Sequence, residues 1–91
     1  MRVRVFADPQ PRCWSGVYRL YDAEWRLLYI GSSVNPMGRL YDHIRHKEWG
    51  ATIAVMVVEW YPNERRTWTE ERRAIRSSRP EHNVIRYRAA A

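Results

Sequence analysis

The feature that most restricts the fold of this chain is the apolar segment formed by residues 52–60. Its longest uninterrupted apolar run, residues 53–58, is six residues long, far short of the roughly 20 that cross a bilayer as a helix. The length and the β-branched side chains are typical of a strand that is buried at the centre of a sheet. The rest of the chain must therefore supply neighbouring strands and helices that cover this strand.

Two shorter segments upstream predict an antiparallel strand pair. Residues 17–21 and 26–30 are rich in Tyr, Leu, Val and Ile, which favour strands. The polar connection between them, residues 22–25, has the length of a hairpin loop. We therefore expect these two strands to pair with each other and to share one sheet with the buried segment.

Two helices are expected to pack on this sheet. The first, residues 36–47, begins with Asn35 as N-cap and Pro36 at the first helical position. Its apolar residues at i, i+3, i+4 and i+7 are Met37, Leu40, Tyr41 and Ile44. The second helix, residues 64–77, ends before Pro80. Each helix can bury one apolar face against the sheet.

These elements predict an α/β chain of the α+β type with the order strand, strand, helix, strand, helix. The sheet is expected to be small, three-stranded, mixed or antiparallel, and flanked by the helices. At 91 residues the chain has room for one folded domain, which we place at residues 16–85. Residues 1–15 then form a basic N-terminal arm, in which residues 3–6 can add an edge strand, and residues 86–91 form a basic C-terminal tail.

The charge of the chain indicates a polyanionic partner. Sixteen Lys and Arg residues against ten Asp and Glu give a net charge of +6, and Lys47 is the only lysine. The planar guanidinium group of arginine suits phosphate, so nucleic acid is the first partner to consider and a membrane surface the second. With no apolar N-terminal leader and a single cysteine, Cys13, the sequence predicts a cytoplasmic protein without a membrane span.

A glutamate lies within the apolar face of the second helix. At 100° per residue Glu71 falls between Ala74 and Ile75, whereas Glu70 lies on the flank of that face. A carboxylate on an inward face is costly unless it is paired, neutralised or bound to a metal ion. The residues alone leave two partners open for Glu71, namely one of the many arginines or a metal ion.

The first helix carries a polar stripe beside its apolar face. Arg39, His43 and His46 follow one another at i, i+4 and i+7. A guanidinium and an imidazole on one face can hold a phosphate and transfer a proton, although many such stripes are simply solvated. A structural zinc site is not expected, because Cys13 and His82 are isolated in the sequence.

Three aromatic residues in the hairpin allow more than one interpretation. Tyr18 and Tyr29 lie on its two strands and can be close across the pair, although tyrosine is also a good strand former. Trp25 occupies a late hairpin position where glycine is common, so we expect it to be exposed. An exposed tryptophan can stack on a base or contact a protein.

Taken in order along the chain, these residues resemble the signature of the GIY-YIG nuclease domain family. The two tripeptides are Gly16-Val17-Tyr18 and Tyr29-Ile30-Gly31. They are followed by Arg39, His43 and Glu71, and by Asn83 after Arg79-Pro80. The match covers residues 16–85, and the family's fold of a small central sheet flanked by helices agrees with the predicted elements.

The resemblance implies an endonuclease that hydrolyses DNA phosphodiester bonds with one Mg²⁺ or Mn²⁺. Glu71 is then the protein ligand of the cation, Arg39 holds the scissile phosphate, and Tyr18 is the general base. His43 assists Tyr18 by hydrogen bonding or proton relay, and Tyr29 orients water or phosphate. Because the reference pKa of tyrosine is near 10, Tyr18 needs a neighbouring cation, Arg39 or His43 to favour the phenolate.

The resemblance also implies supporting residues around this site. Gly16 and Gly31 allow close backbone approach at the cleft, and Asn83 gives structural support. The residues expected to contact DNA are Arg39, Trp25, Arg45 and His46.

A second function stays open beside the nuclease. Members of the family that select their substrates usually carry a further DNA-binding domain, so a partner protein can supply specificity here. The alternative is a catalytically silent nucleic-acid-binding or interaction subunit of a repair, recombination or phage complex on the same fold. In either case we expect a monomer or a weak homodimer.

Overall fold

The computed structural model describes residues 2–83 and contains four strands, two α-helices and one short 3-10 helix. In chain order the elements are β1 (Arg4–Phe6), β2 (Ser15–Tyr21), β3 (Leu27–Ser33), α1 (Pro36–His46), η1 (Gly50–Thr52), β4 (Val55–Tyr61) and α2 (Glu64–Ser78). The predicted α+β class and the order of its main elements are confirmed. The predicted tail, residues 86–91, lies outside the described residues.

The strands form one mixed sheet in the order β1-β4-β2-β3. The hairpin strands β2 and β3 are antiparallel, as predicted, and β4 pairs antiparallel with β2. The segment β4 lies inside the sheet, as its apolar sequence predicts. The expected count of three strands is wrong by one, because β1 pairs in parallel with the free edge of β4. This is the edge strand that the N-terminal arm was expected to be able to add.

Three of the element boundaries that differ from the predictions have clear local reasons. The strand β2 begins at Ser15, two residues early, because Ser15 pairs with Tyr61 of β4. The strand β3 continues to Ser33, because Ser33 pairs with Gly16. The strand β4 begins at Val55 instead of residue 52, because residues 50–52 form η1. A Cβ at Gly50 would lie 2.6 Å from the carbonyl oxygen of Ile44, so this turn requires glycine to pass close to α1.

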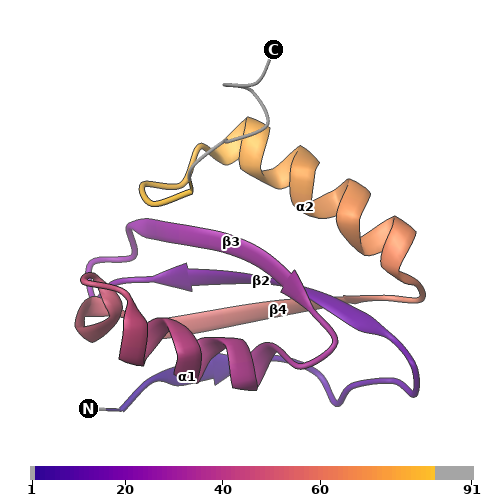
Figure 1. The fold of residues 1–91 in the computed structure, drawn as a ribbon, viewed down its shortest axis with the longest axis horizontal. Coiled ribbons are helices and arrows are strands. Elements are labelled where there is room, and N and C mark those ends of the chain that lie inside the picture. Colours follow the sequence, from indigo (N-terminus) through magenta and orange to yellow (C-terminus); the bar gives the residue numbers. More distant parts are fainter. Residues whose placement is uncertain (1, 84–91) are drawn as a thin grey trace.

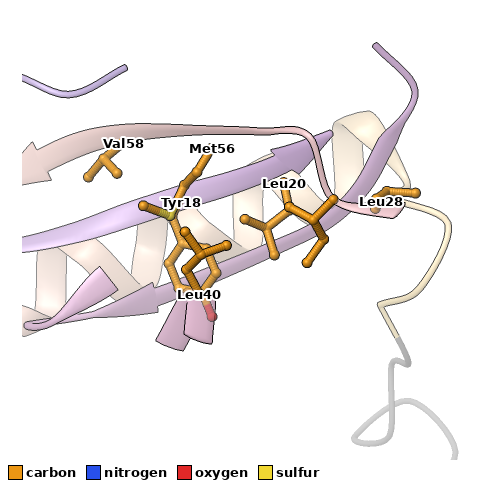
Figure 2. Packing of buried hydrophobic residues seen from close by; sticks show 7 residues of the cluster. Tyr18, Leu20, Leu28, Leu40, Met56 and Val58 are labelled. Atoms are coloured by element: carbon orange, nitrogen blue, oxygen red, sulfur yellow. The ribbon is translucent and has the colours of Figure 1, made fainter. Parts of the chain in front are cut away.

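The two helices cover opposite faces of the sheet (Figure 1). Successive strand residues point to opposite faces, and the core is divided accordingly. On one face Leu40 from α1 packs with Tyr18 and Met56 (Figure 2). On the other face Ala74 from α2 packs with Val17 and Ile30. Among residues 2–83, no helix is long and apolar enough to cross a membrane.

The buried face of α1 is rotated from the predicted one. Its buried residues are Pro36, Leu40 and His43, whereas the predicted face residues Met37 and Tyr41 are 41% and 59% exposed. His43 takes an inward position because its ring packs among aromatic rings and its nitrogen has a partner in the core. The alternative that Arg39, His43 and His46 form a simply solvated stripe is therefore wrong for His43.

The face of α2 is rotated in the same way. Its buried residues are Thr67 and Ala74, whereas Trp68, which helical periodicity places at the margin of the apolar face, is 56% exposed. Thr67 occupies the inward position because its hydroxyl lies 2.5 Å from that of Ser15 and also donates to the Asn63 carbonyl. Glu71 lies between Thr67 and Ala74 on the helix surface, so it still faces the sheet as predicted, although the buried face of α2 is rotated.

The connection between β2 and β3 is a turn that Asp22 stabilises. Its carboxylate accepts hydrogen bonds from the backbone N–H groups of Glu24 and Arg26 and from the Arg26 side chain, each at 2.8–2.9 Å. Trp25 adopts a positive φ of 64°, which is the conformation that glycine favours. Its side chain is 56% exposed, as its position in the hairpin predicts.

Candidate active site

The centre of the candidate site is the hydroxyl group of Tyr18, in the middle of β2. The residue is 1% exposed, and its hydroxyl oxygen lies 2.9 Å from Nε2 of His43 on α1. Within the described residues, the other ring nitrogen of His43 is buried without a hydrogen-bond partner. Tyr18 and His43 therefore form a hydrogen-bonded polar pair inside the otherwise apolar core between α1 and the sheet.

Gly31 gives Tyr18 its path toward the edge of the sheet. The two residues are direct cross-strand partners, and β3 is an edge strand. A Cβ at Gly31 would collide with the hydroxyl oxygen and ring of Tyr18. Glycine is needed at this position because any side chain would push the phenol away from its place against β3.

Burial holds His43 in its neutral form. Its side chain lies in the core, and burial, with the positive charges of Arg39 and Lys47, lowers its pKa to about 4. At neutral pH the ring can therefore accept a proton at one nitrogen. A buried neutral histidine also makes folding sensitive to acid.

We expect the free energy of unfolding to fall by about 2 kcal/mol between pH 7 and pH 5. The unfolded chain binds a proton at His43 below about pH 6.5, whereas the folded chain does not until about pH 4. Denaturant titrations at both pH values would measure this loss. The exposed variant His46→Gln should retain it, and His43→Gln should abolish it. Equal stability of the unaltered protein at both pH values would contradict this prediction.

Aromatic rings pack around the Tyr18 and His43 pair. The ring of Tyr29 lies 4.6 Å from that of His43 and 6.2 Å from that of Tyr18, measured between centroids. Trp49 stacks on both Tyr29 and His43, at 5.7 and 5.5 Å. These contacts restrict the rotamers of the catalytic candidates, so the site is rigid at its base.

Two side chains of opposite charge act on the tyrosines. Burial raises the pKa of Tyr18 and of Tyr29; the positive charge of Arg39 opposes this rise, whereas the negative charge of Glu71 adds to it. Arg39 is exposed on α1, with its Nε 4.0 Å from a carboxylate oxygen of Asp42. Its guanidinium group is therefore accessible to solvent and close enough to Tyr18 to act on it electrostatically.

Glu71 reaches the same edge of the sheet from α2. Its carboxylate accepts a hydrogen bond of 2.7 Å from the hydroxyl group of Ser32, the residue that follows Gly31 in β3. Ser32 points to the α2 face because strand side chains alternate, so the site wraps around the edge of β3. The partner that the structure gives Glu71 is thus a neutral hydroxyl group, which leaves its negative charge available for a cation.

The segment after α2 covers part of the β3 edge and leaves the rest open. Asn83 accepts a hydrogen bond from the N–H of Ile30 and donates one to its carbonyl, both at 2.8 Å. Backbone N–H groups of Glu81 and His82 donate to Leu27 and Leu28. This segment occupies the edge up to Ile30, directly before the Gly31 and Ser32 positions of the site.

The other predicted residues lie at different distances from this centre. Gly16 is close, at the start of β2, where an added Cβ would lie 2.8 Å from Val58 and 3.0 Å from the ring of Trp60. Arg45 and His46 are exposed near the end of α1, about two turns from Arg39. Trp25 lies on the β2–β3 connection at the opposite end of the sheet (Figure 1) and is not brought to the site.

A known protein family matches most of this chain. The model of the GIY-YIG catalytic domain matches residues 14–85, which is most of the chain. The chain belongs to the GIY-YIG family. No curated protein and no solved structure gives a significant match. GIY-YIG domains are generally nuclease domains that act on DNA and use divalent metal ions.

The GIY-YIG site has donor chemistry that suits such an ion. Within residues 2–83, no group of three or more His, Cys, Asp and Glu side chains is placed to hold a metal ion. Glu71 instead offers a half-buried carboxylate beside the Ser32 hydroxyl. Hard oxygen donors of this kind fit Mg²⁺ or Mn²⁺, which keep several waters and bind substrate phosphate at their other positions. The residues present therefore fit a weakly held cation.

Sequence reasoning missed two residues of the GIY-YIG site. Ser32 follows the second tripeptide and could have been placed on the face opposite Tyr29 by strand alternation, but not against Glu71 without knowing which face α2 covers. Trp49 follows α1, and its stacking on Tyr29 and His43 depends on the turn at Gly50. Nothing in the spacing of Trp49 indicates that contact.

Proposed function

We propose that this GIY-YIG protein is an endonuclease that hydrolyses phosphodiester bonds of DNA with one divalent cation, Mg²⁺ or Mn²⁺, bound at Glu71. The observation that supports it most directly concerns the Tyr18 hydroxyl group. It is hydrogen-bonded to a neutral His43, and the charges of Arg39 and Glu71 both act on its pKa. These residues would supply a proton acceptor, a cation for phosphate and a carboxylate for a metal ion at one strand edge. The substrate phosphate would lie over this edge.

Glu71 would hold the cation, assisted by water and by the substrate. When bound there, a divalent cation would stabilise negative charge on the phosphate and lower the pKa of coordinated water. Ser32 would fix the orientation of the Glu71 carboxylate through its hydrogen bond. Arg39 would bind non-bridging phosphate oxygens and stabilise the charge that grows on them in the transition state.

Tyr18 would receive the proton of the attacking water. Because burial raises its pKa, Tyr18 is a neutral phenol at neutral pH and not a resident phenolate. It can still act as a base if its own proton passes to Nε2 of His43 while the oxygen accepts the proton of water. His43 is neutral and can accept this proton. Tyr29, beside both rings, would orient the water or the phosphate.

The test of this function is metal-dependent cleavage of DNA of defined structure. The protein would be incubated with branched, nicked, single-stranded and duplex DNA, in Mg²⁺, in Mn²⁺ and in chelator. We expect cleavage with either ion and none with chelator. DNA binding without cleavage under every condition would overturn the nuclease and support the silent binding module instead.

We expect Arg39→Lys to lose most of the cleavage rate although it keeps the charge. A lysine ammonium is a point charge and cannot reproduce the two parallel hydrogen bonds of a guanidinium to phosphate. The measurement is the single-turnover rate, with Arg66→Lys as control, since Arg66 is engaged with Glu70 at 3.2 Å on α2. If Arg39→Lys keeps more than about half of the rate, only a general electrostatic role remains for this position.

A further inference from the structure

A groove adjoins the candidate site on the α2 side of the sheet. It has a volume of about 440 Å³. Its walls include Ser32, Ser33 and Val34 from the end of β3, and Arg65, Thr67 and Trp68 from the start of α2. Figure 1 shows these two segments at the same end of the sheet. Because Ser32 lines the groove and also donates to Glu71, the groove borders the candidate site.

The most unusual side chain of this groove is Trp68. It is 56% exposed and lies one helical turn before Glu71, so it stands beside the site on the surface of α2. The guanidinium group of Arg72 lies 4.5 Å from the centroid of its ring. Arg65 lines the same groove, seven residues before Arg72. An exposed indole with one arginine over its ring and another in the same groove combines a stacking surface with positive charge, a pattern with which proteins bind single-stranded nucleic acid.

The remaining wall of the groove suits the polar edge of a base better than a phosphate. Glu64 contributes a carboxylate, which repels phosphate but can accept hydrogen bonds from base N–H groups. Ser32 and Ser33 add hydroxyl groups. A space of about 440 Å³ can hold one nucleotide, whereas the base pairs of a duplex are closed within the helix stack.

We propose that this groove binds one unstacked nucleotide beside the scissile phosphate, with its base on the ring of Trp68 and its neighbouring phosphate on Arg65. This inference rests on the proposed nuclease function and adds a substrate class to it. Because an unstacked nucleotide is readily available only where a strand is unpaired, the protein should prefer single-stranded, flapped or branched DNA to uninterrupted duplex.

The test is binding of fluorescently labelled DNA in chelator, so that its outcome does not depend on cleavage. Trp68→Ala should bind a short oligothymidylate roughly 10-fold more weakly than the unaltered protein, and Trp68→Phe should bind within about threefold of it because an aromatic ring is retained. Tyr41→Ala removes an aromatic side chain that is 59% exposed on α1, outside the groove, and should change nothing. Binding of duplex of the same length should be the same for all four proteins.

Two outcomes separate this inference from the nuclease itself. If the protein cuts DNA in a Glu71-dependent manner but Trp68→Ala binds oligothymidylate as tightly as the unaltered protein, the groove proposal is overturned and the nuclease stands. If no DNA is cut but Trp68→Ala selectively weakens binding of single-stranded DNA, the groove proposal is supported and the proposed nuclease function is overturned. Equal weakening on single strands and duplex would also overturn the groove proposal.

Discussion

Glu71→Gln should reduce metal-dependent DNA cleavage by at least about 10³-fold, the scale of losing several kcal/mol of charge stabilisation in the transition state. The substitution keeps the shape of the side chain and retains an oxygen that can accept the Ser32 hydrogen bond. It removes the negative charge that a divalent cation requires from its only proposed protein ligand. Single-turnover cleavage in Mg²⁺ measures this loss, and a denaturant titration checks that the fold is unchanged.

The neighbouring Glu70 provides a matched control for this experiment. Its carboxylate lies 3.2 Å from Arg66 and 3.6 Å from Arg73 on the flank of α2. Exposed pairs of this kind contribute little to stability, so Glu70→Gln should cleave DNA at nearly the unaltered rate. If the two substitutions reduce the cleavage rate equally, the rate depends only on the total negative charge of α2, and Glu71 has no specific role.

The fold was largely predictable because its strands carry strong local signals. The apolar run that became β4 has no other stable position than the interior of a sheet, and the hairpin strands differ from the predictions only at their ends. The strand β1 is different. It has three residues, all exposed, and it pairs in parallel with a strand about 50 residues away. A segment this short has no periodicity of its own, so only the free edge of β4 decides its conformation.

The helix faces were less predictable, because polar side chains took inward positions that periodicity assigns to apolar ones. His43 on α1 and Thr67 on α2 each have a hydrogen-bond partner on the sheet, in Tyr18 and in Ser15. Such partners offset the cost of burying a polar group, but helical periodicity in the sequence does not show them. The rotation leaves Trp68 exposed, at a position that helical periodicity places at the margin of the apolar face.

The candidate site was predictable in its residues but not in its protonation. The order of two tripeptides and four later residues was enough to name Tyr18, Arg39, His43 and Glu71. The family resemblance also implied that Tyr18 needs help to become a phenolate and that His43 assists it, whereas the residues alone left open whether His43 is simply solvated. Burial of both rings changes this chemistry, because it raises the pKa of Tyr18 and lowers that of His43. Proton transfer between them is therefore a better hypothesis than a stable phenolate.

Tyr18→Phe should slow the chemical step by about 10²–10⁴-fold, the usual contribution of a positioned acid or base. The phenylalanine ring keeps the packing against Leu40 and Gly31, but the hydroxyl oxygen that lies 2.9 Å from Nε2 of His43 is lost. Loss of that hydroxyl also leaves Nε2 of the buried His43 without its partner, which should cost about 1–3 kcal/mol of folding stability. The rate must therefore be measured at a temperature where the variant is fully folded.

Binding and a second tyrosine separate catalysis from structure in this experiment. DNA binding of Tyr18→Phe in Ca²⁺, which occupies oxygen sites, should be close to that of the unaltered protein. Tyr21→Phe removes a hydroxyl from the same strand, three residues along and on the opposite face, and should leave the rate unchanged. If Tyr18→Phe cuts as fast as the unaltered protein in a single turnover, the proton of the attacking water does not pass through this phenol. His43 would then be the first alternative base, since its neutral ring is the nearest remaining acceptor.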